Sequence, residues 1–267
     1  MSEAIPRELT AALERSAAAR GRVGATIHYF SELPSTNDEA ARLAEGGAAE
    51  GTTVIASAQT AGRGRLGRTW FSPPGAGLYV SVICRDGGAA PYLSLAGGVG
   101  VADGILAATR LPVEIKWPND IVIDGGCGRR RKVAGILAEA SSAPEGVQHV
   151  VLGFGINLRP AAYPPEIADR ATSLESELGR EVQPGTVLAA TLVALRQCLD
   201  ELAAGNCAQV LARWRVLSPS ASGATVEWQT EAGTRAGRTA GIDEDGALRV
   251  MVNGVPERII SGTLKWV

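Results

Sequence analysis

Residues 113–158 read VEIKWPNDIVIDGGCGRRRKVAGILAEASSAPEGVQHVVLGFGINL. Four runs in this stretch are rich in β-branched residues and are separated by turn residues, a pattern typical of strands. They span 113–117, 121–124, 132–140 and 147–158. The short PND turn between the first two runs brings the chain straight back on itself. This stretch therefore predicts a sheet whose neighbouring strands are mostly antiparallel.

The segments before this stretch alternate between helices and strands. In order, they predict a helix at 9–21, strands at 26–30, 52–59 and 77–84, and a helix at 91–109. Between the first two strands, Thr36 and Glu39 form a capping box that predicts the start of another helix, and Gly46-Gly47 predicts its end.

The segments after this stretch predict two helices within 184–216 and a linker, VLSPSASG, at 216–223. The short segments ATVEWQT, GRTAGI, ALRVMV and VPERII then predict a small β-barrel. The fold class is therefore α+β, with a mixed, mostly antiparallel sheet flanked by helices and a small C-terminal β-barrel. We expect an N-terminal helical segment at 1–25, a main domain at 26–218 and the barrel at 222–267.

The composition is that of a soluble globular protein, with 45% apolar and 20% charged residues among 267. The formal net charge of −2 gives no global positive field that would draw the chain to nucleic acid or to an anionic membrane. No apolar run approaches the roughly 18 residues of a spanning helix, and the N-terminus lacks the apolar core of a secretory signal. We therefore expect a cytoplasmic protein.

Cysteine and histidine are both scarce. The four cysteines form no CxxC pair and predict reduced thiols. They are Cys84, Cys127, Cys198 and Cys207. Two histidines, His28 and His149, disfavour histidine-based triads and zinc sites, so no protein-built metal cluster is expected. The chemistry should depend on Lys, Arg, Asp and backbone groups.

The most unusual segment is QTAGRGRLGRTWF at 59–71, in which glycines space three arginines. Its glycines match G-x-G-x-x-G, but the dinucleotide fingerprint must open a helix, and here TWFSPPG follows. Guanidinium groups bind phosphate or carboxylate through paired hydrogen bonds, and Trp70 offers a flat face to a base. The loop favours a clamp on nucleotide phosphates, and a solvated basic turn is the alternative.

A second polar cluster is KWPND at 116–120, together with Lys132 at the start of a later strand. Two cations can stabilise the negative charge that builds on a phosphorus under attack. Asp120 can hold a metal or accept a proton from an amine. If the strands pair, Asp120 and Lys132 face one region of the sheet without needing to touch. The alternative is a surface turn with solvated charges.

Two further motifs are less specific. Ser35-Thr36-Asn37 can cap a helix and still line a pocket beyond the helix N-terminus. GFGIN at 153–157 suits close approach of the backbone to a nucleotide, and an ordinary strand-to-loop turn is the alternative.

Taken together, these motifs resemble those of the biotin–protein ligase family, in the family's order within residues 26–158. The motifs are Ser35-Thr36-Asn37, GRGRLGR at 62–68 with Trp70-Phe71, KWPND at 116–120, KVAGIL at 132–137 and GFGINL at 153–158. The Arg/Gly loop with KWPND is specific, and the other motifs alone are weak. With the C-terminal β segments, the resemblance covers nearly the whole chain and implies a catalytic domain like that of class II synthetases.

The resemblance implies two half-reactions. Biotin's carboxylate attacks the α-phosphate of MgATP, giving biotinyl-5′-AMP and pyrophosphate, and a lysine of a biotin carboxyl carrier protein domain then displaces AMP. The implied small ligands are ATP, Mg²⁺ and biotin, and the implied partner is the carrier domain of a biotin-dependent carboxylase. We expect no nucleic-acid or membrane partner, and a monomer or weak homodimer.

Site residues are carried over by position. The implied biotin-binding residues are Ser35, Thr36, Asn37, Gln59, Arg63, Gly64, Arg65, Lys132 and Gly135. The implied ATP-binding residues are Arg65, Arg68, Trp70, Asn119, Lys132 and Asn157. The implied catalytic residues are Lys132 at the carboxylate and α-phosphate, Arg65 in the loop above them, and Asp120 beside the acceptor lysine. Gly135 would leave room for the biotin ring, and Lys116 is a weaker candidate with a structural role as the alternative.

Two features depart from the family's pattern. The connection GGCGRRR at 125–131 is longer and more basic than expected, and fewer than 26 residues precede the first strand. A three-helix DNA-binding module does not fit there, so we expect a single-function ligase. The nearest alternative is a lipoate or octanoate ligase, which needs a long apolar channel where this chain has the polar set at 35–37 and 59. A nucleic-acid-binding regulator is disfavoured by the net charge.

Overall fold

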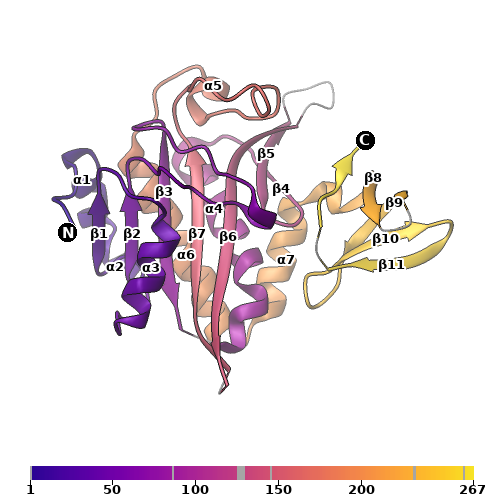
Figure 1. Ribbon diagram of the computed structural model, residues 1–267, viewed down its shortest axis with the longest axis horizontal. Helices are drawn as coiled ribbons and strands as arrows, with labels where there is room; N and C mark the ends of the chain where they lie inside the picture. Colours follow the sequence, from indigo (N-terminus) through magenta and orange to yellow (C-terminus); the bar gives the residue numbers. More distant parts are fainter. Residues whose placement is uncertain (1, 86, 125–129, 145, 231–232, 261) are drawn as a thin grey trace.

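The computed structural model describes residues 2–85, 87–124, 130–144, 146–230, 233–260 and 262–267. At its centre is a seven-stranded sheet with the order β1-β2-β3-β7-β6-β5-β4 (Figure 1). The strands are β1 (Ile27–Phe30), β2 (Thr53–Ala56), β3 (Gly77–Cys84), β4 (Glu114–Lys116), β5 (Asp120–Asp124), β6 (Arg130–Ala143) and β7 (Gly146–Asn157). β1 and β2 pair in parallel, and the other neighbours pair antiparallel. The predicted mixed, mostly antiparallel sheet is confirmed.

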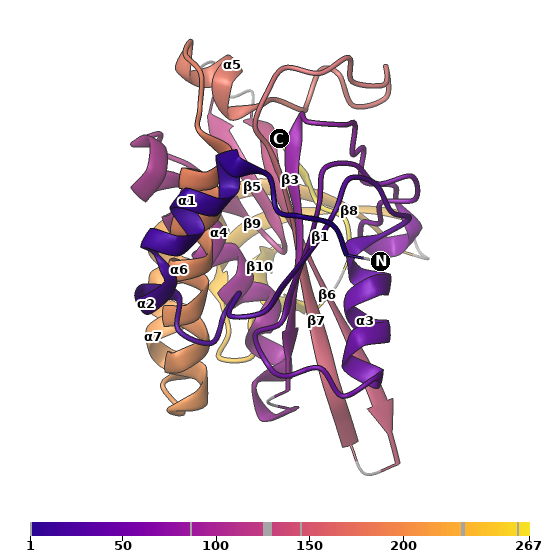
Figure 2. The same ribbon diagram turned by 90° about the vertical axis from the view of Figure 1, so that its left-hand side faces the viewer.

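Helices cover both faces of this sheet (Figure 2). On one face, α3 (Thr36–Glu45) packs against β2, β3 and β7. On the other face, α4 (Leu93–Thr109) packs against β6 and β7, and further helices pack against α4 and α6. These are α1 (Arg7–Arg15), α2 (Ala17–Arg20), α6 (Pro184–Ala203) and α7 (Cys207–Leu217). Because both faces are covered, the nine residues 149–157 of β7 are all buried, which explains their nearly unbroken apolar run.

The helix α4 is the centre of the core. The segment Ala89–Thr109 has the length and composition of a membrane-spanning helix, which the sequence prediction missed. Of its most apolar 18 residues, however, 67% are buried inside the fold. Packing within the protein therefore accounts for the apolar character. Glycine allows α6 to come close, since a Cβ on Gly104 would lie 2.4 Å from the Cα of Thr191.

A separate five-stranded antiparallel sheet ends the chain, in the order β11-β10-β9-β8-β12. Its strands are β8 (Ser222–Thr230), β9 (Gly233–Ile242), β10 (Leu248–Val252), β11 (Val255–Ile259) and β12 (Lys265–Trp266). The Trp117 side chain ties it to the main sheet by donating from Nε1 to Gly246 O over 3.0 Å. The separate β unit is therefore confirmed, while its closure into a barrel and the domain boundaries stay predictions.

Some predicted elements differ in detail. The helix expected at 9–21 is broken at Ser16 into α1 and α2. The predicted linker at 216–223 falls on the connection between α7 and β8, which is shorter than expected because α7 ends at Leu217 and β8 begins at Ser222; Ser218, Ser220 and Ala221 in it are buried. The capping box is also wrong: Ser35 is the N-cap residue of α3, and its side chain makes no capping hydrogen bond.

The remaining differences concern strand length and cysteines. β6 and β7 extend beyond the predicted runs because each provides the other's hydrogen-bond partners as far as Ala143 and Gly146. Three cysteines, Cys84, Cys198 and Cys207, are free thiols as expected. Cys127 and most of the GGCGRRR connection lie outside the described residues.

Candidate active site

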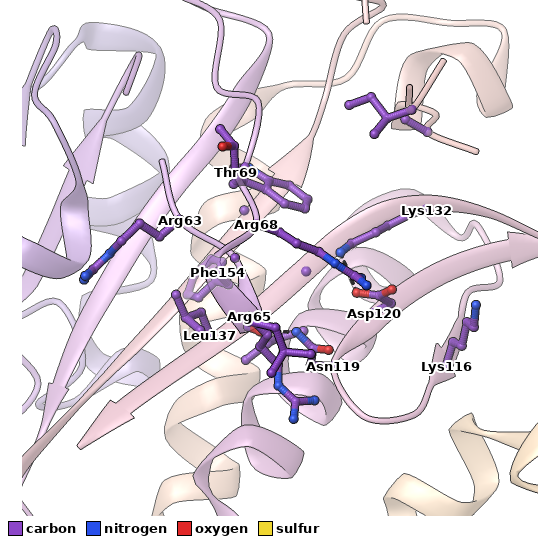
Figure 3. Close-up of a pocket in the computed structure, with 18 of the residues that line it drawn as sticks. Arg63, Arg65, Arg68, Thr69, Lys116, Asn119, Asp120, Lys132, Leu137 and Phe154 are labelled. Atoms are coloured by element: carbon purple, nitrogen blue, oxygen red, sulfur yellow. Dashed lines mark hydrogen bonds and ion pairs between the residues drawn. The ribbon is translucent and has the colours of Figure 1, made fainter. Parts of the chain in front are cut away.

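A cavity of about 470 Å³ lies between the Arg/Gly loop, strands β4 to β7 and the C-terminal segment. Figure 3 shows side chains from the loop and from the strands converging on it. The structure places every residue with an implied ligand role on its wall: Ser35, Thr36, Asn37, Gln59, Arg63, Gly64, Arg65, Arg68, Trp70, Asn119, Asp120, Lys132, Gly135 and Asn157. Residues scattered over more than a hundred positions thus form one site.

The Arg/Gly loop folds back on itself before it reaches β3. Gly64 N donates to Arg68 O over 2.7 Å, and Trp70 N donates to Gly62 O over 2.9 Å. A Cβ on Gly62 would lie 2.5 Å from Trp70 O, so glycine is required at that crossing. The turn itself passes through two left-handed residues, Leu66 at φ 57° and Gly67 at φ 71°. The loop is therefore a compact hairpin that presents arginines to the cavity.

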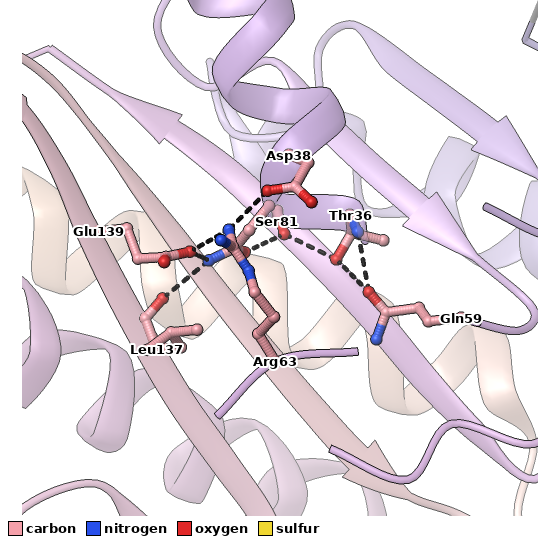
Figure 4. A network of polar contacts seen from close by, with 8 residues as sticks. Thr36, Asp38, Gln59, Arg63, Ser81, Leu137 and Glu139 are labelled. Atoms are coloured by element: carbon pink, nitrogen blue, oxygen red, sulfur yellow. Dashed lines mark hydrogen bonds and ion pairs between the residues drawn. The ribbon is translucent and has the colours of Figure 1, made fainter. Parts of the chain in front are cut away.

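One end of the cavity is a hydrogen-bonded network around Thr36 (Figure 4). Gln59 Oε1 accepts from Thr36 N over 2.8 Å and from Thr36 Oγ1 over 3.1 Å, while Gln59 Nε2 donates to Ser72 Oγ over 2.9 Å. The fully buried Ser81 lies with its Oγ 2.8 Å from Thr36 Oγ1. The Thr36 hydroxyl is occupied by these contacts, which is why it does not cap the helix.

Asn37 continues the network towards the loop. Its Oδ1 accepts from Ser81 Oγ over 2.5 Å, and its Nδ2 donates to Glu139 Oε2 over 2.6 Å and to Leu137 O over 3.4 Å. With its amide hydrogens engaged, Asn37 still has a second lone pair on Oδ1. It can therefore accept a hydrogen bond from an N–H group of a ligand.

Arg63 connects the Arg/Gly loop to this network. Its guanidinium lies 2.8 Å from Glu139 Oε2 and 2.6 Å from Asp38 Oδ1. Exposed pairs of this kind are individually weak, but Glu139 also holds the buried Asn37. Arg63, for which the resemblance implies a biotin contact, is engaged here with two carboxylates. Ser81, Asp38 and Glu139 are network residues that the sequence reasoning missed.

Trp70 lies on a platform made by two glycines. Gly135 of β6 and Gly155 of β7 are cross-strand partners, so they face the same side of the sheet. A Cβ on Gly155 would lie 2.3 Å from Trp70 Nε1, and a Cβ on Gly135 would lie 2.9 Å from Trp70 Cζ3. Lys132 Nζ lies 4.9 Å from the centre of the ring. The space expected for a biotin ring at Gly135 is filled by Trp70 and Lys132 in this structure.

Lys132 and Asp120 form an ion pair with Nζ and Oδ1 2.5 Å apart (Figure 3). The cross-strand partner of Lys132 is Val122, so Asp120 meets it diagonally, within reach of a long side chain. The backbone of Lys132 is fixed as well, because its N–H donates to Arg170 O and its carbonyl accepts from Thr172 N. The two charges therefore touch, which the sequence had not required.

The charge on the cavity wall is strongly unbalanced. Asp120 is the one acidic residue among the described wall residues, against eight cations: Arg63, Arg65, Arg68, Lys116, Arg130, Lys132, Arg170 and Lys265. Burial lowers the pKa of Arg65, Arg68 adds to this, and Asp120 opposes it. Desolvated like charges of this kind favour the binding of a polyanion.

Two parts of the wall were not expected from the sequence. The segment between β7 and α5 (Leu174–Leu178) contributes Tyr163 and Arg170, and it is held by Asn157, whose Nδ2 donates to Thr172 O over 2.9 Å. Residues 262–266 also line the cavity, where Arg68 donates to Thr263 Oγ1 over 2.7 Å. The one sequence signal for these parts was the scarcity of aromatic residues, which make up 4% of the chain and make each of them, including Tyr163 and Trp266, a residue to consider.

Comparison with known proteins agrees with this arrangement. The family described as "Biotin/lipoate A/B protein ligase family" matches residues 28–157. The bifunctional ligase/repressor BirA of Bacillus subtilis is 33% identical over 248 residues, covering 91% of this chain and 74% of that protein. The biotin–[acetyl-CoA-carboxylase] ligase of Paracoccus denitrificans is 34% identical over 226 residues, covering 82% of this chain and 91% of that protein.

A solved structure shows the same relationship in three dimensions. The biotin protein ligase from Aquifex aeolicus in complex with biotin and ATP matches with a TM-score of 0.76 at 28% identity, covering 91% of this chain and 99% of that chain. With the motifs, the cavity and these relatives in agreement, the chain belongs to the biotin/lipoate A/B protein ligase family, as a biotin–protein ligase.

Proposed function

We propose that this ligase activates biotin with ATP and transfers it to a lysine of a biotin carboxyl carrier protein domain. The observation that carries the proposal is one cavity that combines a directional hydrogen-bonding end, at residues 35–37 and 59, with a wall of cations. Biotin's ureido ring offers N–H and C=O groups to the hydrogen-bonding end, and the triphosphate of ATP offers negative charge to the wall of cations.

In the first step, an oxygen of biotin's carboxylate attacks the α-phosphorus, and the bond to the β-phosphate breaks to release pyrophosphate. Negative charge concentrates between the two reactants, where Lys132 can stabilise it. Trp70 gives adenine a face for stacking beside this lysine, and Asn119 and Asn157 lie on the same wall. Ser35, Thr36, Asn37 and Gln59 then orient the ureido ring.

Magnesium would enter with the nucleotide. Among the described residues, no group of three or more His, Cys, Asp or Glu side chains could hold a metal ion. Mg²⁺ commonly keeps several waters and binds substrate phosphates with one or two carboxylates. We therefore propose an ion that is held by the nucleotide phosphates and by water, without a dedicated protein site.

We expect Arg65→Gly to release the activated acid into solvent. The Arg65 side chain is partly buried over the cavity, and its loss would open the Arg/Gly loop and admit water. The measurement is the amount of biotin attached to lysines of an added bystander protein. Arg15→Gly, in the exposed part of α1, is the control. Bystander labelling no higher than that of the unchanged enzyme would contradict this role.

We expect Gly155→Ala to weaken ATP binding. The new Cβ would overlap the Trp70 ring, and loss of one base–aromatic stack is worth about 1–3 kcal/mol, or about 5- to 150-fold in the KM for ATP. The KM for biotin should change less, because the network at Thr36 is not touched. Gly98→Ala is the matched control, since its Cβ would meet Ile115 at an ordinary 3.5 Å.

An equal rise in both KM values would instead indicate general damage to the site. An unchanged KM for ATP would remove Trp70 from the nucleotide site.

The proposed function is tested by mixing the pure protein with ATP, magnesium, a carrier domain and either biotin or lipoate, and weighing the carrier by mass spectrometry. Biotin-sized mass gain that requires ATP is expected. A gain with lipoate and none with biotin would assign the enzyme to the lipoate branch. No gain with either acid would refute the proposal.

We further propose that the protein works in the cytoplasm without binding DNA, as a monomer or weak homodimer. The net charge of −2 and the lack of a disulfide among the three described cysteines support the cytoplasmic location and the lack of DNA binding. Tight binding of operator-like DNA at physiological salt in a gel shift would overturn the proposal that the protein does not bind DNA. The sedimentation velocity of the protein at micromolar concentration tests the oligomeric state.

A further inference from the structure

A cationic corner of the cavity adjoins the Lys132–Asp120 pair, since Lys116 is the cross-strand partner of Asp120. It consists of Lys116 on β4, Arg130 at the start of β6 and Trp266 on β12. Lys116 Nζ lies 6.0 Å from the centre of the Trp266 ring, and Arg130 Cζ lies 5.9 Å from it. The indole therefore holds two cations beside one another, with Arg170 on the same wall.

The positive charge of this corner is poorly balanced within the protein. Among the described residues Lys116 has no carboxylate within ion-pair distance, and the partner of Arg130, Glu114, is 3.5 Å away. Burial lowers the pKa of Lys116, Lys132, Arg130 and Arg170 lower it further, and Asp120 opposes the shift. Holding these cations together costs free energy, which a bound anion would recover.

The alternation of β6 directs Arg130 to this corner. Arg130 and Lys132 are two residues apart and both line the cavity, whereas Arg131 lies on the opposite side, where it pairs with Glu177 over 2.7 Å. The two described arginines of the basic run that departed from the family's pattern thus lie on opposite faces of β6. One arginine serves the cavity and its neighbour serves a structural ion pair.

We propose that Lys116 and Arg130, with Arg170, bind the β- and γ-phosphates of ATP and hold the pyrophosphate that leaves when the α-phosphorus bond breaks. This rests on the proposed function, in which Lys132 serves the carboxylate and α-phosphate. Two phosphates carry several negative charges, which one lysine cannot neutralise. Trp266 fixes the separation of the two cations, so it is a positioning residue.

The test separates the two half-reactions in the full-length enzyme. We expect Lys116→Met and Arg130→Gln each to raise the KM for pyrophosphate in biotin-dependent exchange by roughly tenfold, the effect of losing one charged hydrogen bond. Transfer from preformed biotinyl-AMP to the carrier involves no pyrophosphate and should stay within about twofold. Arg131→Gln removes the same charge from the neighbouring residue and should leave the pyrophosphate KM unchanged.

Direct binding keeps the inference distinct from the proposed function. Calorimetric titration of inorganic pyrophosphate should show weaker binding to Lys116→Met and Arg130→Gln than to the unchanged protein and Arg131→Gln. That result would support the subsite even if no exchange with biotin occurred, which would refute the proposed function alone. Equal losses in exchange and transfer, an equal effect of Arg131→Gln, or unchanged pyrophosphate affinity in both cavity variants would overturn the subsite.

Discussion

Lys132→Ala is expected to slow biotin-dependent exchange of pyrophosphate into ATP by roughly a hundredfold or more, as loss of one donor to developing charge does. The ammonium group is fixed by a strand of the central sheet, by Asp120 and by the Trp70 ring. A charge held in this way needs no reorganisation when the carboxylate attacks the α-phosphate. Alanine would remove this fixed charge.

The loss should not be one of folding. Lys132 and Asp120 are 32% and 30% exposed at their side chains, so breaking their pair should cost about 1 kcal/mol or less. Arg131→Ala is the control, because it removes a charge from the adjacent residue on the opposite face of β6. Thermal unfolding should be similar in both variants, and exchange should fall only in the first. Pyrophosphate exchange by Lys132→Ala near the original rate would show that Lys132 does not take part in the reaction.

Sequence patterns predicted the central sheet well because its strands are rich in β-branched residues between strong turns. They predicted strand ends less well, since the ends of β6 are half-exposed and polar, and only their partners on β7 define them. Helix capping at Thr36 was predicted wrongly for a similar reason. The Thr36 hydroxyl, which the local sequence pattern predicts as the helix cap, instead forms hydrogen bonds with Gln59 and Ser81, which are distant in the chain.

The residues of the candidate site were predictable as a set, but their contacts were not. Arg63 was expected to face a ligand, and the structure gives it Glu139 and Asp38 as partners. No local pattern predicts that a carboxylate on β6 will meet a loop residue far earlier in the chain. The scarcity of aromatics drew attention to Trp266 as a residue, but its place on the cavity wall was unpredictable, because it depends on how the last strand returns to the main sheet.

Asp120→Asn is expected to slow the transfer step by roughly a hundredfold, in the range typical for loss of a general base, while adenylation falls much less. The acceptor lysine must lose a proton before its Nζ can attack the carbonyl and expel AMP. Asparagine keeps the size of the side chain but cannot take that proton. It also removes the anion beside Lys132, which should preserve or increase the attraction of that lysine for phosphate.

The pH dependence distinguishes a base from a residue that only positions the acceptor. An ordinary lysine has a pKa of about 10.4. Below that value, each increase of one pH unit raises the free-amine fraction about tenfold. The transfer defect of Asp120→Asn should therefore shrink as the pH rises, because solvent then deprotonates the acceptor. Asp103→Asn, on α4 and paired with Arg213, is the control for the same chemical change. A defect that is constant with pH, or equal losses in both half-reactions, would show that Asp120 holds the site together and does not accept the proton.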